Sequence, residues 1–209
     1  MSDDATPDTL PVDTGTADAS ERKRRVAPFV ALAVALVLGA LFVVLATSRS
    51  GPDDKLGLVD SPLIGKPAPA VRGTTADGQT FDLSRRKGSW VVVNFFNSRC
   101  GPCKAEHPEL IAFVQQQATL GADGAELYSI DQPPDSAEEI KAFFAARGGD
   151  WPVVLDDDGL FNVAFGVAQV PETFIIDPDG IVRRRWAGPI DSVTLALLLQ
   201  QERNVYGVQ

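Results

Sequence analysis

Apolar residues are arranged in two ways along this chain of 209 residues. Near the N-terminus, residues 26–46 form one long run without a charged residue. After it, short apolar runs alternate with polar turns and with segments of helical periodicity. The long run has the ~20 apolar residues that a helix needs to cross a bilayer. The pattern therefore predicts one transmembrane helix over residues 26–46, followed by a folded domain.

Two other interpretations of the long run were weighed against a membrane anchor. A core helix of this length without a polar face is improbable, and residues 26–46 have no charged residue. A cleaved signal peptide usually has an apolar stretch of only ~7–15 residues and a small-x-small cleavage site. The run is longer than that, and the "VLATS" at its end is a weak cleavage site. We therefore expect an uncleaved anchor.

Charge on the two sides of the run predicts its orientation. We expect residues 1–25 to form a disordered acidic tail that ends in the basic cluster Arg22–Arg25. Only Arg49 follows the run closely, so the positive-inside rule puts the N-terminus in the cytoplasm. We expect a single-pass protein of the cell membrane, with a linker over residues 47–60 and an extracytoplasmic domain over residues 61–209.

The domain predicted after the linker alternates strands and helices. Asp77-Gly78 between extended flanks indicates a hairpin. Trp90–Phe96 is continuously apolar and β-branched or aromatic apart from Asn94, which is typical of a strand buried on both faces. Further strands are expected at 125–130, 151–156, 173–177 and 181–188, and helices at 100–120, 136–149, 158–167 and 191–204. The order predicts an α/β domain of three layers.

Composition and charge narrow the function. Hydrophobic residues make up 44% of the chain and charged residues 22%, which is a globular composition. The formal net charge of −9 disfavours nucleic-acid binding, because phosphate contacts need clustered Lys and Arg. The two cysteines are too few for a disulfide scaffold. The candidate chemistry therefore lies in the cysteine pair itself.

The two cysteines, Cys100 and Cys103, are expected at the start of a helix that follows the buried strand. Pro102 suits the first turn of a helix, where its missing N–H costs nothing. Cys100 would then lie beside unpaired backbone N–H groups and the positive end of the helix dipole, which lower a thiol pKa. Cys103, one turn later and more enclosed, could attack a mixed disulfide formed on Cys100.

A zinc site and a structural disulfide are the alternatives for this pair. Zinc would need two more ligands, and the chain offers only His107 and carboxylates. A structural disulfide that closes so small a loop would constrain the unfolded chain little. A redox dithiol is the favoured interpretation, and the sequence predicts no metal and no cofactor.

Several strings around the cysteines carry a family resemblance. They are "SPLIGKPAPA", "VVVNFFNSRCGPCKAEHPEL", "WPVVLDDDG" and "FGVAQVPETFIIDPDGIVRRRWAGPI", which cover most of residues 61–191. In these strings the chain resembles the membrane-anchored thioredoxin-like proteins of cytochrome c maturation, the DsbE/CcmG group related to ResA and TlpA. The resemblance implies a thioredoxin-like fold, with a central mixed sheet flanked by helices and preceded by an N-terminal β-hairpin. Pro108 should kink the active-site helix.

The resemblance also implies roles for single residues. Cys100 would be the exposed nucleophile and Cys103 the resolving thiol, with Gly101 and Pro102 between them as in reducing thioredoxins. Pro171 would be a cis-proline that faces the dithiol. The residue before it, Val170, would offer its backbone to an extended substrate strand.

Two polar positions near the dithiol depart from ordinary thioredoxin. Asn94 stands where a buried Asp is usual and cannot titrate, so Glu106, one turn after Cys103, is expected to move the proton instead. Arg99 replaces the Trp commonly found before the first cysteine, and its charge should favour the Cys100 thiolate. We interpret His107 as local packing or helix surface.

The resemblance implies a reductase of disulfides in apocytochrome c, resupplied by a membrane electron donor of the CcdA/DsbD kind. Three alternatives come from other classes of function. One is a general dithiol oxidase or isomerase. The second is a peroxidase, which would need a lone peroxidatic Cys in a different loop. The third is an anchored chaperone-like binding module that needs no turnover. Arg183–Arg185 are expected on an alternating strand face, with a docking patch as the alternative.

Overall fold

The structure is a computed structural model that describes residues 20–47 and 57–207 and divides into two compact units, Met1–Gly51 and Pro52–Gln209. The predicted tail over residues 1–19 and most of the predicted linker lie outside the described residues. Each unit is described by itself.

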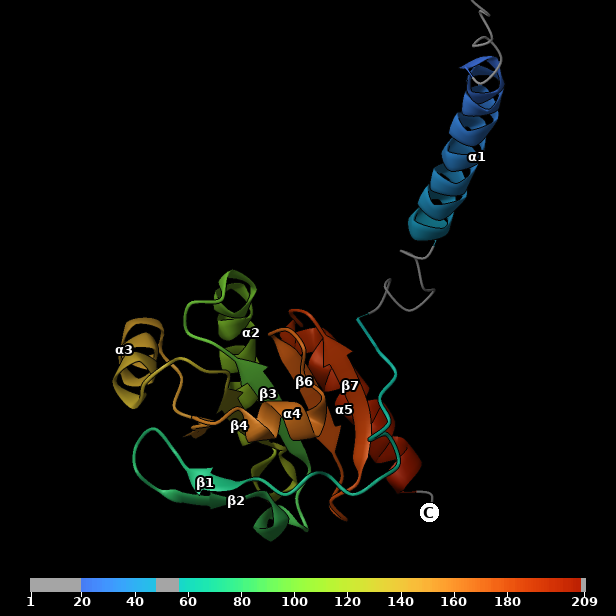
Figure 1. Ribbon diagram of the computed structural model, residues 1–209. Helices are drawn as coiled ribbons and strands as arrows, with labels where there is room; N and C mark the ends of the chain where they lie inside the picture. The colour runs from blue at the N-terminus through green and yellow to red at the C-terminus, as the bar shows by residue number, and fades with distance from the viewer. Residues whose placement is uncertain (1–19, 48–56, 208–209) are drawn as a thin grey trace, which may run out of the picture. The chain divides into compact units, whose positions relative to one another are not determined.

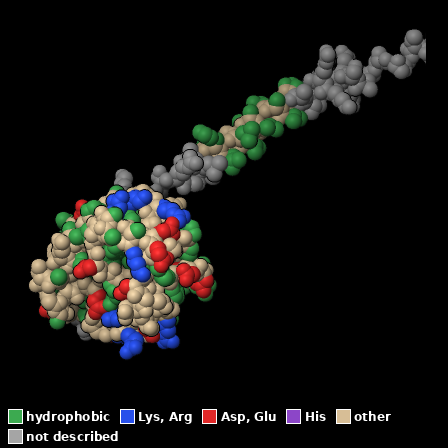
Figure 2. Space-filling view, turned by 90° about the vertical axis from the view of Figure 1, so that its left-hand side faces the viewer, with side chains coloured by type: hydrophobic (Ala, Val, Ile, Leu, Met, Phe, Trp, Pro, Cys, Tyr) green, Lys and Arg blue, Asp and Glu red, His purple; other side chains and the backbone are tan. Residues whose placement is uncertain are grey.

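The first unit contains helix α1, Ser20–Thr47, which covers the segment predicted as a membrane anchor and also includes the basic cluster. Hydrophobic side chains line its described part on all visible sides (Figure 2), and those from residue 28 to residue 43 are exposed. Among the residues that the structure describes, no helix combines the length and the apolar character needed to cross a membrane. The transmembrane helix therefore stays a prediction.

The second unit is built on a mixed sheet of five strands in the order β5-β4-β3-β6-β7 (Figure 1). Strands β3, β4 and β5 are parallel, whereas β6 runs antiparallel to β3 and β7 antiparallel to β6. A separate hairpin of β1 and β2 precedes the sheet in the chain. The strands are β1 Arg72–Thr74, β2 Thr80–Asp82, β3 Val91–Phe96, β4 Glu126–Asp131, β5 Val153–Val154, β6 Glu172–Ile176 and β7 Val182–Ala187.

Helices and short helical turns connect these strands. The α-helices are α2 Gly101–Ala118, α3 Ala137–Arg147, α4 Leu160–Phe165 and α5 Ser192–Tyr206, and the 3-10 helices are η2 Leu83–Arg86 and η3 Gly121–Asp123. The strands and helices predicted for this unit are all present, with ends that differ by a few residues. The strand predicted over 151–156 is shorter in the structure, where only β5 forms. This is because Asp156 turns away from the strand and accepts backbone N–H groups at the start of α4.

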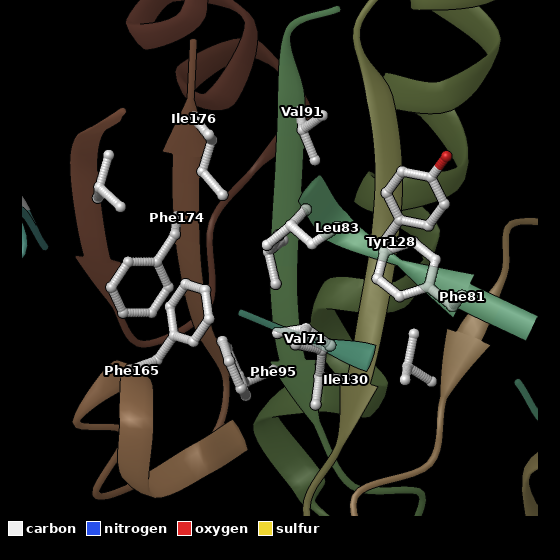
Figure 3. Close-up of a cluster of buried hydrophobic side chains, with 13 residues drawn as sticks. Val71, Phe81, Leu83, Val91, Phe95, Tyr128, Ile130, Phe165, Phe174 and Ile176 are labelled. Carbon is white, nitrogen blue, oxygen red and sulfur yellow. The ribbon is translucent and has the colours of Figure 1, made fainter. Parts of the chain in front are cut away.

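Strand β3 is the central strand of the sheet, and side chains pack on both of its faces. All six of its residues are buried, as the continuous apolar run predicts. On one face, the ring of Phe95 lies 5.1 Å from that of Phe165 and 5.7 Å from that of Phe174, between centroids (Figure 3). On the other face, Val92 belongs to a cluster with Phe113 of α2 and with leucines of α5. The predicted three-layer α/β architecture is confirmed.

The start of α3 provides a test of local sequence signals. Ser136 accepts the N–H of Glu139, and the Glu139 carboxylate accepts the N–H of Ser136, so the two residues form a capping box. Ser136→Ala removes one half of it and is expected to lower the free energy of unfolding by about 1 kcal/mol. Urea denaturation measures this loss. Lys141→Ala, at an exposed position of the same helix, should change stability by less than about 0.5 kcal/mol; an equal loss in both variants would contradict the capping role.

Candidate active site

The dithiol lies where the central strand passes into the longest helix of the second unit. β3 ends at Phe96, and α2 begins at Gly101 with Cys100 as its N-cap and with Pro102 in the first turn. Cys100 and Cys103 are joined by a disulfide. Cys103 is buried, with 3% of its surface exposed, whereas Cys100 is half-buried and both residues between them are exposed. The predicted placement at a helix N-terminus, and the predicted difference in access, are confirmed.

The backbone around Cys100 favours negative charge on its sulfur. The N–H of Cys103 donates to the Cys100 Sγ over 3.0 Å. The carbonyl of Cys100 accepts the N–H of Lys104, so the helical hydrogen bonds begin at the cysteine itself. A thiolate formed there on reduction would meet a donated hydrogen bond and the positive end of the α2 dipole. The geometry therefore suits Cys100 as the attacking sulfur.

A loop distant in sequence faces the dithiol from the start of β6. The Val170–Pro171 peptide bond is cis, as the resemblance implies. The carbonyl oxygen of Val170 lies 3.5 Å from the Cys100 Sγ, across a separation of 70 residues. The carbonyl of Pro171 accepts the N–H of Gly188 over 2.9 Å, which ties this loop to the end of β7. The structure thus brings Val170 and Pro171 to the cysteines.

Glu106 is buried behind the dithiol, with 2% of its surface exposed. It accepts the side-chain N–H of Asn94 over 3.0 Å and the backbone N–H of Ile190 over 3.1 Å. Burial raises the pKa of this carboxyl to about 7, although both hydrogen bonds oppose the rise. Glu106, Asn94 and Cys103 also line one gap that is too tight for a water molecule. A carboxyl that titrates near neutral pH is therefore next to the enclosed cysteine.

Asn94 holds Glu106 from the centre of the sheet. It is fully buried on β3 and donates to Thr173 Oγ1 over 3.1 Å as well as to Glu106. Its own Oδ1 has no hydrogen-bond partner in the described part of the protein. Asn94 therefore orients the acid and, as an amide, does not titrate itself.

Arg99 was expected to favour the Cys100 thiolate, but its charge lies beside two carboxylates. Its guanidinium binds Glu139 and lies 3.7 Å from Asp135 Oδ1. The hydrogen bond and charge of Glu139 raise the pKa of Arg99. Two carboxylates thus balance the cation that was expected to favour the Cys100 thiolate. The sequence could not show this, because the partners are about 40 residues away in the chain.

His107 has a packing role, as predicted, but in the interior and not on the helix surface. Only 4% of its surface is exposed, and its ring contacts those of Phe143, Phe144 and Trp151. Its Nε2 lies 2.8 Å from the carbonyl oxygen of Gly148. Burial lowers the pKa of the imidazole.

The three consecutive arginines of β7 are paired within the protein. Each guanidinium contacts a carboxylate that is itself largely buried, which leaves little free charge for a docking patch. The pairs are Arg183–Asp177, Arg184–Glu202 and Arg185–Glu172.

Sequence reasoning missed the carboxylates near the end of β4. Asp131 and Asp135 are buried, with 2% and 5% of their surfaces exposed. Burial, followed by the charge of Asp135, raises the pKa of Asp131 to about 8. The available signal was that β3 and β4 are parallel, so that residues after both strands meet at one edge of the sheet. Within the described ranges, no three His, Cys, Asp or Glu side chains form a group suited to a metal ion.

The chain is similar in sequence to known thiol-disulfide exchange proteins. Residues 64–185 match the sequence model of the AhpC/TSA family. The thiol:disulfide interchange protein HelX of Rhodobacter capsulatus is 37% identical over 131 residues, which are 61% of this chain and 70% of the relative. The thiol:disulfide interchange protein DsbE of Escherichia coli is 32% identical over 173 residues, which are 81% of this chain and 88% of the relative.

Structural similarity agrees with the sequence. The crystal structure of a thioredoxin family thiol:disulfide interchange protein from Chlorobium tepidum has a TM-score of 0.57 and 27% identity. The match covers 68% of this chain and 98% of that one. The fold of the second unit is therefore thioredoxin-like.

Proposed function

Since this chain belongs to the AhpC/TSA family and is a thiol-disulfide oxidoreductase of the DsbE/HelX kind, we propose that it reduces disulfides of apocytochrome c. The substrate segment is the CxxCH site to which haem attaches. Reduction frees the two thiols that haem attachment needs. The observation that carries the proposal is the half-buried Cys100 at a helix N-terminus, 3.5 Å from the backbone of the cis-Pro171 loop.

The reaction is a two-step exchange. The Cys100 thiolate attacks one sulfur of the substrate disulfide; a mixed disulfide forms, and the other substrate sulfur leaves as a thiolate that takes up a proton. The Cys103 thiolate then attacks the Cys100 sulfur and releases the second substrate thiol. Two electrons pass to the substrate, and the protein is left with the Cys100–Cys103 disulfide.

The surrounding residues assist these steps. The backbone of Val170, held by the cis bond to Pro171, pairs with an extended substrate segment beside Cys100. Gly101 and Pro102 are exposed and leave the approach to the nucleophile open. Glu106, oriented by Asn94, accepts the proton of Cys103 when this thiol becomes the attacking group. Arg99 is next to the nucleophile, and its charge is balanced by two carboxylates. Its role is therefore to hold the local structure more than to stabilise the thiolate.

We place the domain outside the cytoplasm, tethered to the cell membrane. This part of the proposal rests on the charge-free run over residues 26–46 and the basic cluster before it. A tether keeps the domain close to a membrane electron donor of the CcdA/DsbD kind. That donor would return the Cys100–Cys103 disulfide to the dithiol after each cycle, since dithiols outside the cytoplasm tend to be oxidised.

A dithiol oxidase with the same fold would transfer electrons in the opposite direction. The reduction potential distinguishes the two, because strong oxidants have values near about −120 mV and reducing thioredoxins near about −270 mV. A peroxidase is not favoured, since the chain has only the paired cysteines. A potential near the thioredoxin value is the expected result.

Deletion of the gene, followed by haem staining of separated membrane proteins, tests the proposed substrate. Covalent cytochromes c should be lost and should return when the wild-type chain is supplied. Normal staining in a strain without a paralogue would exclude apocytochrome c as the substrate. Thiol-disulfide exchange by the purified protein would be unaffected by that outcome.

A further inference from the structure

The short connection between β3 and α2 sets the position of Cys100. It consists of Asn97, Ser98 and Arg99. The N–H of Arg99 donates to the Asn97 side chain over 2.9 Å, and the N–H of Cys100 donates to the Asn97 carbonyl over 3.1 Å. These two bonds are internal to the connection. The N–H of Ser98 donates to Asp135 Oδ2, which belongs to the loop between β4 and α3.

A second contact joins the same two loops. The side-chain N–H of Asn97 donates to the carbonyl of Gln132 over 2.7 Å, and the N–H of Gln132 donates to the carbonyl of Phe96 over 2.8 Å. The dithiol connection is therefore anchored to the β4–α3 loop at its start, by Asn97, and at its middle, by Asp135. Asp135 is the carboxylate that accepts a backbone N–H of this connection.

Asp135 is itself held firmly. Its side chain has no exposed surface, and its Oδ2 accepts the Ser98 N–H. Its Oδ1 has no hydrogen-bond partner among the described residues. The charge of Asp135 is one of the causes that raise the pKa of the buried Asp131 carboxyl, so the two carboxyls lie close together. The guanidinium of Arg99 lies 3.7 Å away on another side and also binds Glu139 at the start of α3. A fully buried carboxylate that accepts a backbone N–H and faces a guanidinium has little freedom to move.

We propose that Asp135 is a positioning residue for Cys100, which it holds at the N-terminus of α2 through its hydrogen bond to the backbone of Ser98. The position of Cys100 matters because its sulfur accepts the Cys103 N–H over 3.0 Å, and this hydrogen bond stabilises the Cys100 thiolate. A looser connection would let the sulfur leave this donor. The proposal rests on the proposed exchange at Cys100, and it deepens that function.

The hydrogen bond and the negative charge of Asp135 have opposite expected effects on the pKa of the Cys100 thiol. Loss of the hydrogen bond should raise the pKa of the Cys100 thiol, because the thiolate loses its aligned donor. Loss of the negative charge alone should lower that pKa, because a nearby anion disfavours a thiolate. Asp135→Ala removes both the bond and the charge. Asp135→Asn removes the charge but keeps an oxygen that can accept the Ser98 N–H.

The measurement is the pH dependence of iodoacetamide labelling at Cys100 in the reduced, full-length protein, read by mass spectrometry. Asp135→Ala should raise the labelling midpoint by about one pH unit and slow labelling below the midpoint about tenfold. Asp135→Asn should leave the midpoint unchanged or slightly lower. Asp157→Ala is the matched control, because Asp157 is an exposed carboxylate close enough for its charge to raise the pKa of Asp131. In the described part of the chain, no hydrogen bond joins its side chain to Asn97, Ser98 or Arg99.

A midpoint that falls or stays in place in Asp135→Ala would overturn the proposal, as would equal upward shifts in both Asp135 variants. If Asp135→Ala does not fold, hydrogen exchange of the Ser98 amide decides. The amide should be protected in the wild type and in Asp135→Asn, and exchange as fast as in an open loop would overturn the proposal. The labelling needs no substrate, so a failed cytochrome assignment and a failed role for Asp135 give different results.

Discussion

A Cys100→Ser variant is expected to show no measurable thiol-disulfide exchange. The serine hydroxyl is not ionised near neutral pH, whereas the Cys100 sulfur is placed at a helix N-terminus and accepts the Cys103 N–H. The first step of the exchange, attack on the substrate disulfide, is then impossible. The loss should be at least about 10³-fold, the limit of most assays, because no other group can replace the nucleophile.

The assay is single-turnover reduction of a peptide whose CxxCH cysteines form a disulfide, followed by mass spectrometry. Cys103→Ser serves as the matched control, because it removes the same atom type three residues along the same helix. It should still attack the peptide, but the mixed disulfide on Cys100 should accumulate because no second thiol resolves it. If Cys100→Ser instead restored covalent cytochromes c in a deletion strain, a binding module without turnover would be the better description.

The strands and helices were predictable wherever local and tertiary requirements agree. The apolar run that became β3 is buried at every position because sheet neighbours and helices cover both of its faces. The capping box of Ser136 and Glu139 marks the start of α3, and Pro102 marks that of α2. Each of these signals acts within a few residues, so the chain alone carries it.

The electrostatic settings of the site were not predictable from local signals. The sequence predicts that the charge of Arg99 favours the Cys100 thiolate, because its partners Glu139 and Asp135 belong to another helix and loop and are not evident from the chain. Likewise, His107 is buried because the aromatic rings of α3 and the ring of Trp151 fold over it. Such pairings depend on which loops meet at one edge of the sheet. The order of elements along the chain suggests which strands are neighbours, but not which side chains of their loops come into contact.

Glu106→Gln is expected to slow resolution of the mixed disulfide by about 10²-fold at neutral pH. The carboxyl lines the same tight gap as Cys103 and is close to half ionised at pH 7, so it can accept the Cys103 proton there. The amide introduced by the substitution cannot. It can keep the hydrogen bond from Ile190, and Asn94 can turn its unpartnered Oδ1 toward the new donor. The fold should therefore remain intact.

Glu106→Gln should raise stability while it lowers activity, because the pKa of Glu106 is higher in the folded protein than in the unfolded chain. The folded-state pKa of Glu106, about 7, is above its ordinary value of 4.5, so between these pH values the folded protein binds more protons than the unfolded chain. The contribution of Glu106 to stability is then fully present below about pH 4.5 and is lost as pH rises to about 7, a loss on the order of 3 kcal/mol. Glu106→Gln avoids this loss, so urea denaturation should find the variant as stable as the wild type at pH 4 and more stable at pH 8.

Glu109→Gln is the control that separates Glu106 from any other glutamate of α2. Glu109 lies three residues further on, is not buried, and binds the N–H and hydroxyl of Ser192, which lowers its pKa. Its substitution should leave the inflection near pH 7 in the pH–rate profile of thiol labelling in place, whereas Glu106→Gln should remove it. A profile unchanged by Glu106→Gln would take this carboxyl out of the mechanism. Its raised pKa would then reflect only the cost of burying a carboxyl beneath the dithiol.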